Sequence, residues 1–447
     1  MRQTDVLIVG AGPTGLALGI DLARRGVDAL VVERGDTLTP GSRGKGLQPR
    51  TLEIYEDLGV LDAILAAGGP YPVGMIWQDG KQAGEHEMFD PAQDGEEGSR
   101  FTVPWMVPQW RNQEILRARL AELGGGIAFG HELTRIEQDG EGVTAYFAAG
   151  DPVRARYAVA ADGGRSAVRR ALGIGMTGET VDPDPLLVVD VRITGLDRTW
   201  WHVFPPAGEG TGFLALCPLA GTADFQLVAQ FPDGTDLEPL LSLAGVRAVI
   251  ADRTHLDPGD VTEVRWSSDF RPRAALADRF REGRVLLAGD AAHVHSPAGG
   301  QGLNTSVQDA YNLGWKLGAV LGGRAPESLL DTYEEERRPN AAAMLGLSTA
   351  IHRGEARRGA KTRQLGLNYR DSSLTEETRR TPGGIRAGDR VPDRTLDGER
   401  LFDRLRGPDW TVITLEEGVL LVRPDGYVGW AGETETGMTE YRARVGC

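Results

Sequence analysis

The chain has 447 residues, 40% of them hydrophobic and 25% charged, with a formal net charge of −15 at pH 7. Its length allows two or three domains with sizeable cores, and its negative charge disfavours nucleic acid and anionic membrane surfaces as partners. No apolar run approaches the roughly 18 residues of a membrane-spanning helix. Cys217 and Cys447 are the only cysteines, so we expect no disulfide framework, no thiolate metal cluster and a cytoplasmic protein.

The first glycine-rich segment lies between a predicted strand and a predicted helix. Its residues are Gly10, Ala11, Gly12, Pro13, Thr14 and Gly15. An apolar run over 6–9 precedes it and a helical pattern over 16–25 follows it, which is the strand, tight turn and helix that a dinucleotide needs. The first glycine of such a motif allows the turn, the second lets the backbone approach a pyrophosphate, and the third lets the helix lie close to the strand.

A second predicted strand, over 29–32, ends at Glu33, whose carboxylate can accept hydrogen bonds from a ribose and disfavours a 2′-phosphate. Arg34 follows it, and a glycine-rich basic loop over 42–50 contains Arg43. Cations on such a loop suit contact with phosphates, and a solvated basic loop is the alternative. At this point both FAD and NAD fit the pattern.

Helical patterns over 49–58 and 109–123 flank a polar, glycine-rich stretch over 68–99. Gln109 and Arg111 lie at the start of the second helix. These residue types alone indicate no particular chemistry.

The second motif is a short apolar strand, a turn and a basic helix over 157–170, with Asp162 and Gly163 in the turn. Beyond it, short β-rich runs between 184 and 231 are broken by Gly, Pro and Asp and predict an antiparallel sheet. This block separates motifs of one domain, so the chain must leave that domain and return to it. The active site should then lie at the interface between the two domains.

The third motif follows another predicted strand, over 284–288, and enters a long helix. Its acidic residue is Asp290, and its glycine-rich loop includes Pro297, Gly299, Gly302, Leu303 and Asn304. Backbone N–H groups where a helix begins can stabilise negative charge on a ligand. Gly299 is expected where the chain needs a positive φ angle or a close approach. For Asp290, a simple loop cap is the alternative.

His293 and His295 lie inside the third motif. The pair could be half of a metal site, but no Cys or third His lies at a suitable spacing, and such sites need three or four ligands. We therefore expect no metal. Proton transfer by either imidazole stays open, because imidazole titrates near neutrality.

In order and content, the three motifs resemble those of class A (single-component) FAD-dependent aromatic hydroxylases, the class of para-hydroxybenzoate hydroxylase. The similarity covers roughly residues 1–350 and is greatest to polyketide-tailoring members of the rifampicin monooxygenase type. It implies an α/β fold, in which a Rossmann-like FAD-binding domain is interleaved with an antiparallel β-sheet substrate domain, and noncovalent FAD.

By this resemblance, Pro297 borders the flavin and the substrate, with Gly299 in the same oxygen-handling loop. Leu303 and Asn304 contact the isoalloxazine. The full set of residues expected to contact FAD is Gly10, Gly12, Pro13, Thr14, Gly15, Glu33, Arg34, Arg43, Gln109, Arg111, Asp162, Gly163, Asp290, Pro297, Gly302, Leu303 and Asn304.

The domain boundaries follow from the same pattern. The FAD-binding domain is expected to comprise 1–70, 100–180 and 265–350, and the substrate-binding sheet 71–99 and 181–264. A polar stretch over 354–384 is expected to be a linker. Residues 385–447 resemble a shortened thioredoxin-like extension, and because it lacks a Cys-x-x-Cys pair we expect no redox role.

The resemblance implies a monooxygenase that takes hydride from NADPH or NADH, binds O2 at the reduced flavin and transfers one oxygen atom from a C4a-hydroperoxide to a phenolic ring, with polyketides among the candidate substrates. The sequence singles out no catalytic base. Baeyer–Villiger oxidation on the same fold and a non-catalytic flavin-binding protein are the alternatives. We expect a monomer or a homodimer.

Overall fold

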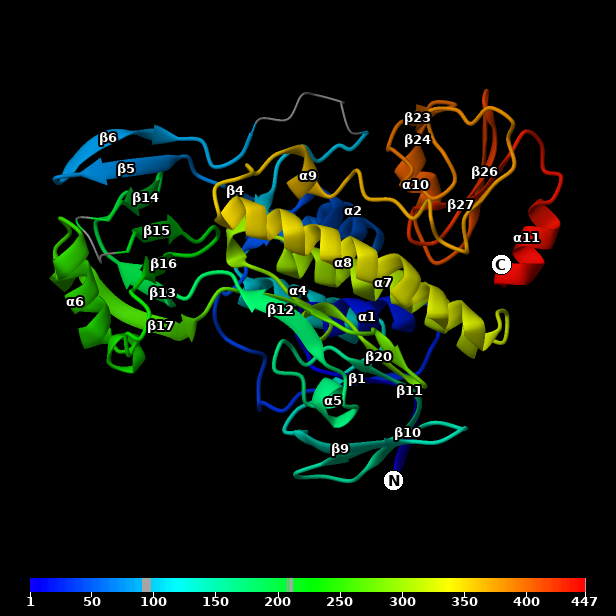
Figure 1. Ribbon diagram of the computed structural model, residues 1–447, viewed down its shortest axis with the longest axis horizontal. Helices are drawn as coiled ribbons and strands as arrows, with labels where there is room; N and C mark the ends of the chain where they lie inside the picture. Colours follow the sequence, from blue (N-terminus) through cyan, green and yellow to red (C-terminus); the bar gives the residue numbers. More distant parts are fainter. Residues whose placement is uncertain (91–97, 207, 209–211, 447) are drawn as a thin grey trace.

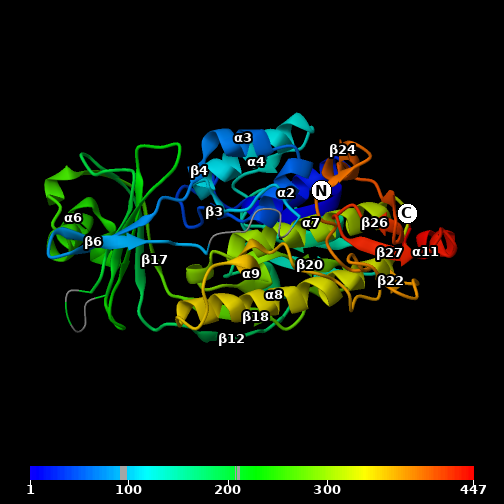
Figure 2. The ribbon, with the colours of Figure 1, turned by 90° about the horizontal axis from the view of Figure 1, so that it is seen from above.

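The computed structural model describes residues 1–90, 98–206, 208 and 212–446, so residues 91–97 of the expected substrate segment lie outside the described residues. A central α/β domain has a seven-stranded sheet at one end and a C-terminal module at the other (Figure 1). Figure 2 shows the same order from above, with the long helix α8 (Asp331–His352) extending along the central domain toward the C-terminal module. Among the described residues, no helix is both long enough and apolar enough to cross a membrane.

The central domain is built on an eight-stranded sheet. Its strands are, in spatial order, β19 (Arg281–Glu282), β20 (Val285–Leu287), β11 (Val153–Ala160), β1 (Arg2–Val9), β2 (Ala29–Val32) and β8 (Ile127–Ala128), with β10 (Val143–Phe147) and β9 (Leu133–Gln138) attached beside β11. The strands from β20 to β8 are parallel. Consecutive residues such as Val6 to Val9 are all buried, because both faces of these strands are covered.

Helices α1 (Pro13–Ala23) and α7 (Gly302–Leu321) pack against each other beside this sheet. Gly314 permits the contact, because a Cβ atom there would lie 2.0 Å from Asp21 Oδ2. The predicted helices over 49–58 and 109–123 are confirmed as α2 (Pro49–Asp57) and α4 (Gln109–Glu122). The smaller elements are α3 (Leu61–Ala67), α5 (Ala167–Ala171), the 3₁₀ turns η3 (Gly289–Ala291), η4 (Pro297–Gly299) and η5 (Glu327–Leu330), the sheet of β3 (Gly46–Leu47), β7 (Trp105–Met106) and β4 (Gly69–Pro70), and the sheet of β12 (Met176–Thr180), β18 (Arg273–Ala277) and β21 (His293–Val294).

The seven-stranded sheet confirms the predicted antiparallel pattern between 184 and 231 and extends it. Its strands are, in spatial order, β17 (Val261–Phe270), β13 (Leu186–Ile193), β16 (Phe225–Gln230), β15 (Leu214–Pro218), β14 (Trp201–Phe204), β5 (Gly74–Gln78) and β6 (Lys81–His86). Only β14 and β5 are parallel neighbours. The expected boundary at 264 therefore falls inside β17, a polar edge strand that lacks an apolar signal.

The two faces of this sheet have different neighbours. Leu187 and Val189 pack with α6 (Leu243–Arg253), which the 3₁₀ turns η1 (Glu238–Leu241) and η2 (Pro258–Asp260) flank. Side chains alternate along a strand, so Asp190 belongs to the opposite face. Gln226, paired with Asp190, donates a hydrogen bond to the Ser42 carbonyl of the central domain. That second face is thus the interface between the sheet and the central domain.

The C-terminal module contains a mixed four-stranded sheet and two short helices. Its elements are β22 (Glu376–Glu377), β27 (Val428–Gly432), β26 (Gly418–Val422) and β25 (Thr411–Leu415) in spatial order, the hairpin of β23 (Thr395–Leu396) and β24 (Glu399–Arg400), and the helices α10 (Leu401–Leu405) and α11 (Met438–Val445). The linker expected over 354–384 is in fact packed: it holds α9 (Ala360–Arg363) and β22, and Tyr369 and Leu374 are buried. Its apolar residues follow no period, so the pattern could not reveal them.

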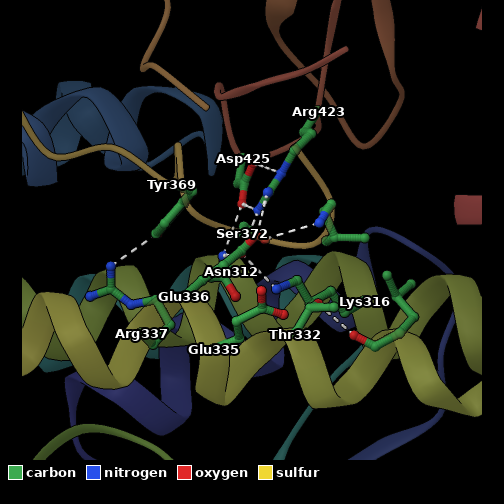
Figure 3. A network of polar contacts seen from close by, with 12 residues as sticks. Asn312, Lys316, Thr332, Glu335, Glu336, Arg337, Tyr369, Ser372, Arg423 and Asp425 are labelled. Carbon is green, nitrogen blue, oxygen red and sulfur yellow. Dashed lines mark hydrogen bonds and ion pairs between the residues drawn. The ribbon is translucent and has the colours of Figure 1, made fainter. Parts of the chain in front are cut away.

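A buried network of charges fastens the C-terminal module to the central domain (Figure 3). Glu336 of α8 accepts hydrogen bonds from Arg423 at 2.6 and 2.8 Å and from Lys316 at 2.7 Å. Asp425 pairs with Arg423 at 2.6 Å and accepts a hydrogen bond from Trp315 at 3.0 Å. Two cations and two carboxylates thus neutralise one another where their side chains are almost fully buried. The module is therefore an integral part of the fold.

Replacing Glu336 by Gln should lower the free energy of unfolding by about 3 kcal/mol, because breaking a buried ion pair leaves uncompensated charge. Glu335→Gln is the matched control: Glu335 is exposed on the same helix, and its contact with Ser373 should contribute at most about 1 kcal/mol. Urea unfolding followed by tryptophan fluorescence measures both. Equal stability losses in the two variants would contradict the fastening role of the network.

Candidate functional site

The three glycine–aspartate motifs meet at one edge of the central sheet. β1, β11 and β20 are parallel neighbours, with Val9 opposite Ala160 and Ala160 opposite Leu287. The segments that leave these strands are the three motifs, so they lie side by side at the carboxyl ends of the strands. In open α/β sheets, ligands bind at this edge.

Glycines make this close meeting sterically possible. At Gly10, where φ is +109°, a Cβ atom would lie 2.3 Å from the Ala161 carbonyl oxygen, and at Gly15 it would lie 2.0 Å from the Gly10 carbonyl oxygen. At Gly289, where φ is +63°, it would lie 2.6 Å from Thr14 Oγ1. The first motif is thereby in direct contact with the other two.

The N-terminus of α1 is open for an anion. Gly12 is the N-cap residue, no side chain caps the helix, and a Cβ atom at Gly12 would have nothing within 4 Å. Pro13 occupies the first turn, where a missing N–H costs little. The free N–H groups and the helix dipole at this end suit a pyrophosphate.

Glu33 lies beside the same turn. Its carboxylate accepts hydrogen bonds from the backbone N–H groups of Ala11, at 2.9 Å, and Gly35, at 3.1 Å. Glu33 is half-buried, and it therefore orders the glycine turn while remaining accessible. Arg34, the next residue, is exposed.

Asp162 stabilises the helix that follows it. Its Oδ2 accepts hydrogen bonds from the N–H groups of Ala167 at 2.7 Å and Val168 at 3.2 Å. Its Oδ1 is buried and has no hydrogen-bond partner among the described residues. Burial raises the pKa of this carboxyl, and the Ser166 hydroxyl opposes that shift. Gly163 supplies the turn with a φ of +82°.

Asp290 lies next to the N-terminus of α7. Its Oδ1 is 4.0 Å from the position that a Cβ atom would take at Gly302. The residue is exposed, yet protein surrounds it closely enough that burial raises the pKa of its carboxyl, while His293 and the exposed Arg43 lower that pKa. Arg43, expected to contact phosphates, thus lies near the third motif. Because Asp290 is exposed, a polar ligand group can reach its carboxyl.

We expected either a close approach or a positive φ at Gly299. The structure has the close approach at Gly299 and the positive φ at its neighbour Gly300. A Cβ atom at Gly299 would lie 3.1 Å from Ser348 Cβ, so this position requires a close approach to α8. The positive φ, +62°, belongs instead to Gly300, where a Cβ atom would have nothing nearer than 3.9 Å. The turn is packed on α8 at Gly299 and exposed at Gly300.

Asn304 ties the start of α7 to the segment around β3. Its side-chain oxygen accepts hydrogen bonds from Gln48 N at 2.8 Å and Thr51 Oγ1 at 2.7 Å. Its amide group donates to the carbonyls of Gly46 at 2.9 Å and Gly300 at 2.8 Å. These bonds use its full side-chain capacity. Any contact of Asn304 with a ligand is therefore left to the backbone.

Gln109 and Leu303 contact the basic loop, whereas the described contact of Arg111 lies along its own helix. Gln109 Oε1 accepts a hydrogen bond from the N–H of Gly44 at 2.9 Å, and Leu303 Cδ1 lies 3.5 Å from the position of a Cβ atom at Gly44. Arg111 is exposed and pairs with Glu114 of the same helix at 2.8 Å.

His293 and His295 have different surroundings. His293 Nε2 is 2.5 Å from Asp309 Oδ2, and Asp309 also pairs with Arg337 at 2.8 Å and accepts a hydrogen bond from Gly289 N at 3.0 Å. Burial lowers the pKa of His295 well below its ordinary value, so its imidazole is neutral at neutral pH. The described residues contain no group of three or more His, Cys, Asp or Glu placed to hold a metal ion.

Sequence reasoning included Lys45 only as one cation of the basic loop over 42–50 and did not select Asp190. Both residues lie at the interface with the seven-stranded sheet. Asp190 is 2% exposed, and Lys45 donates a hydrogen bond to Gln226. An acidic residue inside the apolar run Leu186–Ile193 was the available signal, because an isolated buried carboxylate is costly and usually has a purpose.

Residues 3–348 match the family model described as FAD binding domain. The chain belongs to that family. Its cofactor is FAD, and the open N-terminus of α1, the accessible Asp290 and the unpartnered Oδ1 of Asp162 fit that dinucleotide.

Two curated relatives match almost the whole chain. A flavin-dependent monooxygenase of Mycobacteroides abscessus is 43% identical, over 98% of this chain and 99% of the relative. A rifampicin monooxygenase of Rhodococcus hoagii is 35% identical, over 97% and 96%. The crystal structure of aklavinone-11 hydroxylase with FAD and aklavinone is 28% identical, has a TM-score of 0.84 and covers 99% of both chains. The protein is thus an FAD-dependent oxidoreductase of the monooxygenase type.

Glu33→Ala should weaken FAD binding by roughly ten- to a hundredfold, because a hydrogen bond to a charged group contributes about 1.5 to 3 kcal/mol. The variant also loses the hydrogen bond from the Ala11 N–H to Glu33, which orders the glycine turn. Asp36→Ala, at an exposed position of the same loop, is the control and should leave the affinity unchanged. Titration of the apoprotein with FAD, followed by flavin fluorescence, measures the affinities. An unchanged affinity in Glu33→Ala would remove Glu33 from the site.

Proposed function

We propose that the protein hydroxylates a phenolic ring of a polyketide-type aromatic compound, using NADPH or NADH and O2. We call the sheet edge where the three motifs meet the flavin edge, and the face of the seven-stranded sheet that carries Asp190 and Gln226 the inner face. The observation that carries this proposal is that the two are joined by polar contacts such as Lys45 to Gln226. An interface between two domains is where small-molecule sites form. The names of similar proteins, rifampicin monooxygenase and aklavinone-11 hydroxylase, support the substrate class.

Each motif has a role in holding FAD. The N-terminus of α1 and Gly12 receive the pyrophosphate, and Glu33 receives a ribose. Asp290 and Arg43 meet the polar tail. The N-terminus of α7 stabilises negative charge on the ring system, because its backbone N–H groups and dipole face the site.

FAD bound here supplies hydride acceptance and activation of O2. The protein contributes position and exclusion of water. The Pro297–Gly299 turn, fixed on α8 through Gly299, holds the flavin side of the site, and the seven-stranded sheet covers the other side. In this arrangement, the seven-stranded sheet forms the substrate domain and the eight-stranded sheet forms the FAD-binding domain.

We further infer that the C-terminal module is a shortened thioredoxin-like domain with a structural role. Its mixed sheet and flanking helices support this, and the sequence offers it no Cys-x-x-Cys pair. The use of NAD(P)H suits a cytoplasmic enzyme, and because the site is built from one chain, a monomer suffices, although a homodimer is compatible with it.

Gly300→Val should leave FAD bound but uncouple NADPH oxidation from product formation, because a β-branched residue is strained at a φ of +62°. Gly300→Asn is the matched control, since Asn tolerates the left-handed region. NADPH consumption, hydrogen peroxide and hydroxylated product are measured together. If Gly300→Val stays as coupled as Gly300→Asn, this turn does not shape the oxygen-transfer site.

The function itself is tested with the FAD-loaded protein, NADPH and ¹⁸O₂ on a panel of tetracyclines, anthraquinones and simple phenols. We expect at least one ring substrate to accelerate NADPH oxidation and to gain one ¹⁸O as a new hydroxyl group. Insertion of the label into a carbon–carbon bond as an ester would establish the Baeyer–Villiger alternative. No substrate-dependent oxidation across the panel would support the non-catalytic alternative.

A further inference from the structure

A row of polar side chains crosses the inner face of the seven-stranded sheet. Asp190 of β13 is paired with Gln226 of β16, and Gln226 is paired with Cys217 of β15. All three residues are buried. Directly paired residues of antiparallel strands have Cβ atoms about 5 Å apart, so these side chains are neighbours on one face.

Lys45 reaches this row from the loop between β2 and β3. Its ammonium group donates a hydrogen bond to Gln226 Oε1 and lies 4.6 Å from the centre of the Trp201 ring. Among the described residues, no carboxylate lies within ion-pairing distance of it. A half-buried cation whose partners are an amide, an aromatic ring and the Cys217 thiol, with no carboxylate among them, is suited to bind an anion.

The surroundings of Lys45 lower the pKa of its ammonium group. Burial lowers the pKa of its ammonium group, and Arg358 lowers it further, while the Cys217 thiol and Asp190 oppose that shift. An anion bound beside Lys45 would relieve the cost of this burial. The site therefore favours a ligand that becomes negatively charged on binding.

Asp190 is the carboxylate of this row. Its Oδ1 has no hydrogen-bond partner among the described residues. Burial raises the pKa of its carboxyl to about 6, against the influence of Ser42 and Lys45, and Asp224 adds to the increase. With this raised pKa, Asp190 is a stronger base than an ordinary aspartate, which suits it to accept a proton from a phenol whose anion the Lys45 ammonium stabilises.

The cluster is also connected to the flavin edge. Arg358 donates a hydrogen bond to the Ala298 carbonyl of the Pro297–Gly299 turn at 2.8 Å. Gly44, which precedes Lys45, adjoins Leu303 at the start of α7. Lys45 thus lies between the flavin edge and the sheet, where the proposed function requires the ring substrate to bind.

We propose that Lys45 binds the ionised hydroxyl group of the aromatic substrate and that Asp190 accepts its proton. This inference rests on the proposed function. When the substrate binds, its O–H bond breaks, the proton moves to an Asp190 carboxylate oxygen directly or through one water, and the electron pair stays on the substrate oxygen beside the Lys45 ammonium. The phenolate or enolate is more electron-rich and so reacts more readily with an oxygen electrophile. The site thereby selects rings that carry an ionisable hydroxyl group.

The test uses 1,4-dihydroxyanthraquinone, which turns from orange to violet when it ionises, with the FAD-loaded protein. We expect the bound dye to ionise at a pH at least about 1 unit lower than the free dye, because an adjacent cation favours the charged form. Lys45→Arg should keep this shift. Lys45→Met, which retains the length but not the charge, should abolish it, and Asp190→Asn should slow ring hydroxylation more than it weakens dye binding.

Circular dichroism and FAD content identify variants that have failed to fold. If Lys45→Met is one of them, the dye titration of the wild type decides the inference. Equal dye titrations in Lys45→Met and wild type would overturn the inference, as would a dye that does not bind or does not shift in the wild type. Each of these three results can coexist with ¹⁸O incorporation into other rings, in which case the proposed function stands. A Lys45-dependent shift without ¹⁸O product from any ring would instead defeat the proposed function and, with it, the activating role of Lys45.

Discussion

The parallel register of β1, β11 and β20 is the constraint on which the site depends. It brings three segments separated by more than a hundred residues each to one edge of one sheet. Their contact then requires glycine at Gly10, Gly15 and Gly289, because a side chain at any of them would collide with a neighbouring backbone or with Thr14. The cofactor site is thus a consequence of strand order, and the glycines are the steric condition for it.

Helix α8 connects this site to the rest of the molecule through two adjacent residues. Glu336 belongs to the buried network that fastens the C-terminal module. Arg337, the next residue, pairs with Asp309, which holds both His293 and the backbone N–H of Gly289. One helix therefore positions the third motif and anchors the C-terminal module. In the function we propose, the module contributes to stability and the chemistry takes place at the interface between the two sheets.

The sequence was informative where function depends on short backbone patterns. The strand, glycine turn and helix around Gly10 to Gly15 have such a local physical signature. It was uninformative where side chains meet across the sheet: Lys45 and Gln226 are 181 positions apart, and no period links them. The packed segment over 354–384 escaped prediction for a related reason. Its buried residues, such as Tyr369, are stabilised by partners elsewhere in the chain rather than by a local apolar pattern.

The central claim is that one edge of the eight-stranded sheet holds FAD and that the inner face of the seven-stranded sheet covers the reacting ring. A crystal structure of the protein with FAD and 1,4-dihydroxyanthraquinone tests it most directly. We predict the pyrophosphate at Gly12 and the N-terminus of α1, the flavin ring at the start of α7, and a hydroxyl oxygen of the anthraquinone beside Lys45. A dye bound away from the inner face of that sheet, or a flavin ring remote from Gly300 and Gly302, would contradict this arrangement.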